Sequence, residues 1–170
     1  MTKIFLFILI FASFHIFCME DKEWYDYLVD QCRIVQVPLD VVKAILMNEN
    51  PELNPSAISK QNENGSYDLG LFQLNDKYLY IDFVSSYWNC AELFEWDNPY
   101  HNIYVAVRHI QWLYMLFRTQ PTLQSRAYSI AMAYNCGCTA VMQGKVPASS
   151  VRYAVAVVDY VWGWKNENND

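Results

Sequence analysis

A single acidic residue, Glu49, stands where an apolar helical pattern meets a polar loop. The residues before it, Val42, Ile45 and Leu46, recur at the spacing of one helix face and point toward a core. A short apolar segment with a glutamine, residues 70–74, follows the loop. An acid at the end of an apolar helix loses contact with water, and this desolvation raises its pKa. Because such a carboxyl group keeps its proton near neutral pH, the pattern predicts a general acid that protonates a leaving oxygen.

The elements that must position this acid are predicted to be helices. Strand patterns are confined to two short segments, residues 67–74 and 78–83. Pro51 and Pro55 end the helix of Glu49 directly after the acid, because proline does not continue a helix. We therefore predict a mostly α fold (α+β with minimal strand), a helical domain with a substrate cleft. The helical patterns cover residues 24–35, 39–47, 103–117, 123–134 and 151–162, the last with Ser149 or Ser150 as its cap.

The N-terminal residues have the pattern of an export signal. Lys3 precedes an apolar run over residues 4–12, which is shorter than the about 20 residues of a bilayer-spanning helix. Export would place the protein in the periplasm or cell envelope. Cys18 is a candidate for lipidation, so signal and lipid are the predicted links to a membrane. The expected parts are a signal peptide (1–18), one domain (23–163) and a polar tail (164–170).

The charge of the chain argues against nucleic acid as a partner. Twelve basic residues face 18 acidic ones, which gives a net charge of -6, whereas phosphate binding needs clustered Lys and Arg. The balance leaves neutral or mixed-charge glycans open as ligands.

Four cysteines follow the predicted signal, and an even number in an exported protein favours disulfides. Cys136 and Cys138 are too close in sequence to pair easily with each other. Each is therefore expected to pair with Cys32 or Cys90 if bonds form, and buried free thiols are the alternative. The Cys-x-Cys spacing differs from the usual zinc pattern, so no metal site is predicted.

Five motifs occur in order along the chain, and together they carry a resemblance. They are Glu49 after residues 44–46, then residues 54–59, 70–75, 98–103 and 133–137. This order resembles the soluble lytic transglycosylase (SLT) domain, a lysozyme-like fold that cuts bacterial peptidoglycan. Residues 64–68 look most like the small transglycosylases of secretion and pilus machineries, and also like animal-type lysozymes. The resemblance implies peptidoglycan glycan strands as substrate, a secretion or pilus apparatus as a candidate partner, and no cofactor.

The resemblance implies a role for each matching residue. Glu49 matches the acid and base that cleaves the bond between N-acetylmuramic acid and N-acetylglucosamine and closes a 1,6-anhydro ring. Tyr134 matches the hydroxyl that approaches and orients this carboxyl group. Gln73 and Phe72 match the substrate-contacting segment, the former through its amide and the latter through its ring face.

Three further matches are less specific. Ser59 lines the cleft or caps a turn, and Asn135 binds substrate or holds its loop together. Asp68 lies where animal-type lysozymes carry their second carboxylate, so a hydrolytic lysozyme that uses Glu49 and Asp68 is an alternative. Asn50 departs from the serine that commonly follows the family's acid, and this departure motivates a second alternative, a non-catalytic protein that binds the cell wall.

Overall fold

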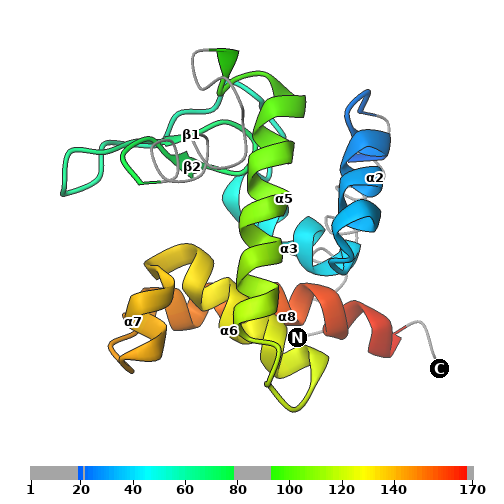
Figure 1. Cartoon of the computed structure of the whole chain (residues 1–170), viewed down its shortest axis with the longest axis vertical. Coiled ribbons are helices and arrows are strands. Elements are labelled where there is room, and N and C mark those ends of the chain that lie inside the picture. The colour runs from blue at the N-terminus through cyan, green and yellow to red at the C-terminus, as the bar shows by residue number, and fades with distance from the viewer. Residues whose placement is uncertain (1–18, 21, 79–92, 168–170) are drawn as a thin grey trace, which may run out of the picture.

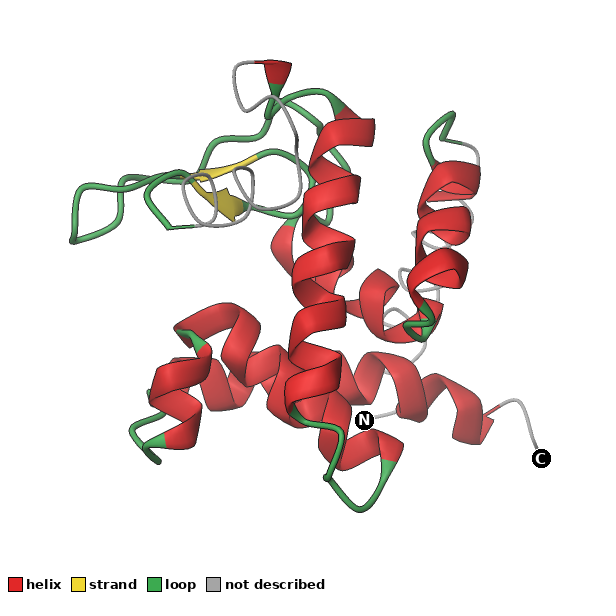
Figure 2. Cartoon of the chain, viewed as in Figure 1, coloured by secondary structure: helices red, strands yellow, loops and turns green. Residues whose placement is uncertain are grey.

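The computed structural model describes residues 19–20, 22–78 and 93–167, and within them the chain is mostly helical (Figures 1 and 2). Six helices account for most of these residues, and a two-stranded sheet follows the second helix. This confirms the predicted fold class. The helices are α2 (Tyr25–Val35), α3 (Leu39–Glu49), α5 (Pro99–Leu116), α6 (Leu123–Cys136), α7 (Cys138–Met142) and α8 (Ala148–Glu167), and the strands are β1 (Asp68–Leu69) and β2 (Leu74–Asn75).

Local sequence explains where α5 and α6 begin. The side chain of Asn98 accepts a hydrogen bond from the backbone N–H of Tyr100, and Pro99 occupies the first turn, where its missing N–H costs nothing. Thr122 and Ser125 form a reciprocal capping box at the start of α6. Both devices satisfy N–H groups that a helix start leaves without partners, and so they fix where the two helices begin.

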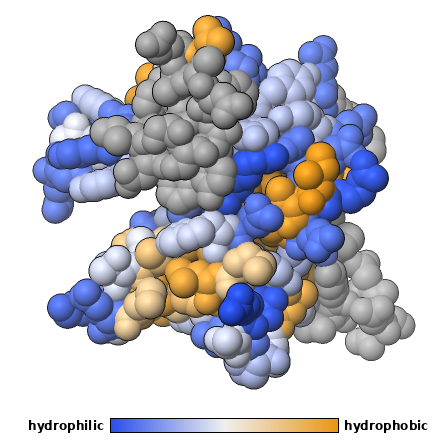
Figure 3. Space-filling view, viewed as in Figure 1, coloured by the Kyte–Doolittle hydropathy of each residue, from blue (hydrophilic) through white to orange (hydrophobic). Residues whose placement is uncertain are grey.

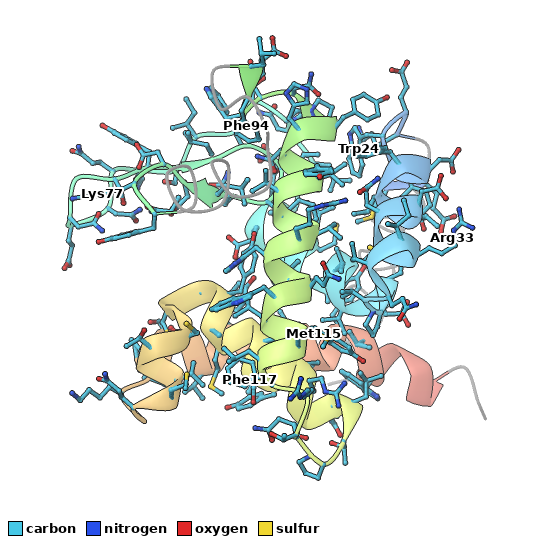
Figure 4. All side chains as sticks on the ribbon, viewed as in Figure 1. Trp24, Arg33, Lys77, Phe94, Met115 and Phe117 are labelled. Atoms are coloured by element: carbon cyan, nitrogen blue, oxygen red, sulfur yellow. The ribbon has the colours of Figure 1, made fainter. Side chains whose placement is uncertain are left out.

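The helices enclose one core, in which α8 packs against both α3 and α6. In Figure 1, α5 runs along the long axis, with α2 on one side and the sheet on the other, while α6, α7 and α8 lie at its far end. Figure 4 shows Lys77 on the sheet side of α5, across from Trp24 and Arg33. The acid-bearing helix, α3, contacts both α8 and α2. Its fully buried residues include Val42, Ala44, Ile45 and Leu46.

The sheet is a small antiparallel hairpin. Asp68 pairs with Asn75 and Leu69 with Leu74, and Ile58 forms a further bridge to Leu69. We call residues 58–77 the hairpin region. The strand pattern predicted over residues 67–74 corresponds to this hairpin, although a tight turn occupies its middle. Most of the second pattern, residues 78–83, lies outside the described residues.

Several sequence-based expectations differ from the structure. The helix α7 was not predicted, because five residues are too few for a helical period to emerge. The last helix begins at Ala148, so Ser149 and Ser150 lie inside it and not at its cap, and it continues to Glu167, into the expected polar tail. The predicted signal peptide and Cys18 lie outside the described residues.

The predicted pairing of Cys136 or Cys138 with Cys32 is wrong, and the free-thiol alternative holds for the cysteines that the structure describes. Cys32, Cys136 and Cys138 are free thiols, and Cys90 lies outside the described residues. The physical reason is position: Cys32 is buried in the core on α2, whereas Cys136 and Cys138 are half-buried at the corner between α6 and α7. Burial also raises the pKa of the Cys32 thiol to about 12, so it stays protonated.

The surface of the hairpin region differs in polarity from the surface of α6 and α7. Figure 3 shows an indentation between the hairpin region, whose described surface is mainly hydrophilic, and the side formed by α6 and α7, which carries hydrophobic surface.

None of the helices in the described part of the chain is long and apolar enough to span a bilayer.

Candidate active site

Glu49 is the last residue of α3 and lies among groups from the sheet and from α8. Burial raises the pKa of its carboxyl from 4.5 to about 7. Two smaller influences oppose each other: a hydrogen bond from Tyr153 lowers the pKa, and the negative charge of Asp68 raises it. At neutral pH the group therefore exists in both protonation states, as a group that must donate and later accept a proton requires.

Tyr153 is the direct hydrogen-bond partner of this acid. Its hydroxyl donates to Oε1 of Glu49 over 2.7 Å. The side chain comes from the second turn of α8, a helix that packs on α3. Burial, together with the charge of Glu49, holds the pKa of Tyr153 well above 10, so the hydroxyl remains a donor. Tyr153 thus fixes one rotamer of the carboxyl group.

Tyr134, the residue predicted to supply that hydrogen bond, has another acceptor in the structure. The Tyr134 hydroxyl donates to the backbone carbonyl of Phe72 over 2.8 Å. Burial and the nearby charge of Glu49 hold its pKa well above 10. The ring of His109 packs against Tyr134 at 5.5 Å between centroids, and burial lowers the pKa of this histidine to about 4. Tyr134 therefore lies near the acid, but its hydrogen bond goes to the backbone of Phe72, in the turn that forms the opposite wall of the site.

Phe72 contributes its backbone to this wall. Its ring is 0% exposed, so the expectation that the ring faces a sugar is wrong, because no surface of it reaches solvent. The backbone N–H of Phe72 donates to Oδ1 of Asn102 over 2.9 Å, while its carbonyl accepts from Tyr134. Side chains from α5 and α6 thus satisfy both backbone polar groups of Phe72 and tie this wall to the two helices.

The turn that leads to Phe72 requires a glycine. Gly70 has φ +77°, and a Cβ there would lie 2.6 Å from the carbonyl oxygen of Trp96. Asn102, itself fully buried, donates from Nδ2 to the carbonyls of Leu69 and Trp96, each over 3.1 Å. The turn is thus fastened to the first turn of α5.

Gln73 sits at the end of this turn with φ +48°, an unusual conformation for a residue other than glycine. Its Nε2 donates to the carbonyl of Gly70 over 2.8 Å. The side chain is half-buried, so part of it is accessible to a ligand. The amide has a structural bond, and its predicted contact with substrate stays a prediction.

The carboxylate of Asp68 is held by two amides of the hairpin region. Oδ1 accepts from Asn75 over 2.7 Å and Oδ2 accepts from Asn62 over 3.1 Å. The same two amides donate to the hydroxyl of Ser66, which is buried. Asp68 is therefore an oriented, half-buried carboxylate whose charge acts on Glu49.

Ser59 and Asn135 make bonds within the protein. The hydroxyl of Ser59 accepts from the N–H of Asp68 over 2.9 Å and donates to the carbonyl of Lys60, as a turn residue does. Asn135 is exposed, and its Oδ1 accepts from the hydroxyl of Ser150 over 2.7 Å. These bonds agree with the turn and loop alternatives, and the predicted substrate contacts stay predictions.

Sequence reasoning missed two residues of the site, Tyr153 and Asn102. For Tyr153 the helical periodicity was a usable signal. Tyr153 shares a helix face with Ala154 and Val157, both fully buried, so periodicity would have directed it to the core. Asn102 lay inside a recognised motif, but its role depends on contacts with residues about 30 positions away. In the part of the chain described, no group of three or more His, Cys, Asp or Glu side chains is placed to hold a metal ion.

A mostly helical domain with a half-buried glutamic acid at a helix end, near a small hairpin with a second carboxylate, is typical of the lysozyme-like class of glycan-cleaving proteins. The chain belongs to the transglycosylase SLT domain family, whose model matches residues 31–153. The matched range includes Glu49, the hairpin region and, at its end, Tyr153. No curated protein matches the chain.

Proposed function

We propose that the protein is a peptidoglycan lytic transglycosylase in which Glu49 is the general acid and base. The observation that carries the proposal is the state of this carboxyl group: burial raises its pKa to about 7 and Tyr153 holds it, in a chain of the SLT family. A proton donor with this pKa is matched to chemistry near neutral pH.

The reaction follows from one carboxyl group that works twice. Protonated Glu49 gives its proton to the oxygen between N-acetylmuramic acid and N-acetylglucosamine, and the C1–O bond breaks with its electrons on the leaving oxygen. The resulting carboxylate then takes the proton of the muramyl 6-hydroxyl, whose oxygen bonds to C1. The product is a 1,6-anhydro sugar, and Glu49 returns to its protonated state without the use of water.

Tyr153 supports both halves of this cycle. Its hydroxyl donates to Oε1 of Glu49, which favours the carboxylate and leaves the other oxygen for the substrate. Tyr134 acts indirectly, because its hydroxyl donates to the carbonyl of Phe72 and so helps to position the adjacent Gln73. Gln73 is our candidate for the contact with an acetamido group.

A hydrolytic lysozyme is the second candidate, and the state of Asp68 favours it. Asn62 and Asn75 bind both oxygens of this carboxylate, so a second carboxylate is held in a fixed orientation near an acid of raised pKa. In that reaction Asp68 would stabilise or attack C1, and water would complete the cleavage.

The product of digestion separates these functions. Purified peptidoglycan is incubated with the protein, and the released muropeptides are examined by mass spectrometry. We expect 1,6-anhydro ends, and reducing muramic ends would establish the lysozyme. Glu49→Gln should lower the rate about 10²- to 10⁴-fold, while the exposed Glu52→Gln is the matched control. Binding of glycan strands without any release by the parent protein would identify a cell-wall-binding protein.

The cellular setting is part of the same proposal. We infer export through residues 1–18 to the periplasm or cell envelope, where peptidoglycan lies, with Cys18 as a candidate lipid anchor. A secretion or pilus apparatus remains our candidate client. Cell fractionation of the full chain and of Cys18→Ser would locate the protein and test the anchor.

A further inference from the structure

The residue that follows Glu49 carries a buried side-chain amide. Asn50 is 5% exposed, and its N–H makes the last helical hydrogen bond of α3, to the carbonyl of Leu46 over 2.9 Å. Its own backbone leaves the helix at φ -147°. Whatever holds this side chain therefore also holds the end of the helix on which the acid stands.

The amide closes the loop after the helix. Nδ2 of Asn50 donates to the carbonyl of Asn54 over 2.7 Å, and Oδ1 accepts from the N–H of Asn54 over 3.2 Å. This two-point pairing resembles the pairing of two strands, and it fixes residue 54 relative to the helix end.

The same Nδ2 also reaches the opposite wall of the site. It donates to the carbonyl of Gly70 over 3.4 Å, across 20 residues of sequence. That carbonyl also accepts from Nε2 of Gln73, so one oxygen joins the helix of the acid to the turn of the glutamine. Gly70 is in turn fixed to the loop by its N–H, which donates to the carbonyl of Ala57 over 2.8 Å.

The chemistry of these contacts requires an amide. Asparagine offers two N–H donors and one acceptor, and all three are used here. A serine offers one donor, so it could not satisfy both carbonyls. An aspartate offers no donor when ionised and would place acceptor against acceptor.

We propose that Asn50 is a positioning residue, which sets the distance between the acid of α3 and the Gly70–Gln73 turn through these three hydrogen bonds. Its burial keeps it from the substrate, and it acts through Glu49 and Gln73. The inference rests on the proposed function where it is tested by the rate of muropeptide release. Where it is tested by the NMR titration of Glu49, it rests on the geometry alone.

The test uses Asn50→Leu, which keeps the shape and removes the three bonds, and Asn50→Ser, which restores one donor. Asn48→Leu is the matched control, because Asn48 is exposed and, among the described residues, its side chain bonds only within its own helix, to Ala44 over 2.8 Å. Rates of muropeptide release give kcat and KM, and carbon-13 NMR follows the titration of the Glu49 carboxyl in the full chain without substrate.

We expect Asn50→Leu to lower kcat at least about tenfold with KM changed less than about threefold, because a displaced acid affects the chemical step more than binding. Asn50→Ser should recover part of the rate, and Asn48→Leu should match the parent. The Glu49 titration should shift in Asn50→Leu and not in Asn48→Leu. Parent-like kcat and titration in folded Asn50→Leu, or in Asn50→Ser if the first variant does not fold, would overturn the proposal. A parent protein that releases nothing would instead refute the proposed function, and the NMR titration would still decide the role of Asn50.

Discussion

The hydroxyl of Tyr153 donates to Oε1 of Glu49 over 2.7 Å, which joins two residues that are 104 positions apart in the chain. The bond connects the last long helix to the end of the second described helix. It favours the charged form of the acid, while burial and Asp68 favour the neutral form. The pKa of Glu49 therefore depends on its burial and on two side chains from separate elements, Tyr153 and Asp68, each of which can be changed alone.

Removal of the Tyr153 hydroxyl should move the pH profile upward. Tyr153→Phe deletes a bond that lowers the pKa of Glu49, so the alkaline limb of kcat, where the acid loses its proton, should shift to higher pH. The loss of orientation should lower kcat by about tenfold at the optimum. Both quantities come from rates of muropeptide release between pH 5 and about 9.

Tyr160→Phe and Tyr134→Phe provide the comparison for this variant. Tyr160 lies on the same helix, and its buried hydroxyl has no hydrogen-bond partner among the described residues, so its removal should change little. Tyr134→Phe leaves the carbonyl of Phe72 without its donor and should lower the free energy of unfolding by about 1–3 kcal/mol. An alkaline limb that moves in Tyr134→Phe and not in Tyr153→Phe would contradict our assignment.

Neutralisation of Asp68 should move the same limb in the opposite direction. The charge of Asp68 raises the pKa of Glu49, so Asp68→Asn should shift the alkaline limb to lower pH. In a transglycosylase the variant should still form 1,6-anhydro ends, because the substrate supplies the nucleophile. Glu63→Gln, an exposed change in the same hairpin region, is the control. Complete loss of cleavage in Asp68→Asn would favour the lysozyme.

The acid should also make stability depend on pH. Between pH 4.5 and about 7 folded Glu49 retains a proton that the unfolded chain has released, so the free energy of unfolding falls as pH rises through this window. Glu49→Gln has no proton to lose and should lack this decline, which is at most about 3 kcal/mol. Urea unfolding of both proteins at pH 4.5 and at about pH 8 measures it. The same pH dependence in parent and variant would show that folding does not raise the pKa of Glu49.

Two glycines with left-handed backbones should respond differently to alanine. At Gly70, φ +77°, a Cβ meets the carbonyl of Trp96 at 2.6 Å, whereas at Gly144, φ +67°, it meets no atom within 4 Å. Gly144→Ala should cost about 1 kcal/mol of backbone strain alone. Gly70→Ala should cost more and also lower activity, since the wall must shift. Thermal unfolding of the two variants compares them, and equal losses would mean that the wall is not tightly packed at Gly70.

The sequence was sufficient for the helices and for the acid, because both depend on local patterns. Apolar periodicity placed five of the six described helices, and Glu49 stood out by its position at a helix end. It was insufficient for hydrogen-bond partners. The sequence around a tyrosine does not indicate which group its hydroxyl bonds to. The hydrogen bond to Glu49 was therefore predicted for Tyr134, whereas Tyr153 makes it. Phe72 was misread for a related reason, since an aromatic ring beside a site looks the same in sequence whether it faces sugar or core.

The contact between α3 and α8 also determines when the site can exist during synthesis. The acid is made early and its hydrogen-bond donor 104 residues later, so a nascent chain that has released α3 still lacks Tyr153. The serine that bonds to Asn135 arrives on the same late helix, one turn before that tyrosine. A chain that ends before α8 would carry Glu49 without the hydrogen bond from Tyr153. The order of the elements along the chain means that the bond from Tyr153 to Glu49 can form only after α8 has been synthesised.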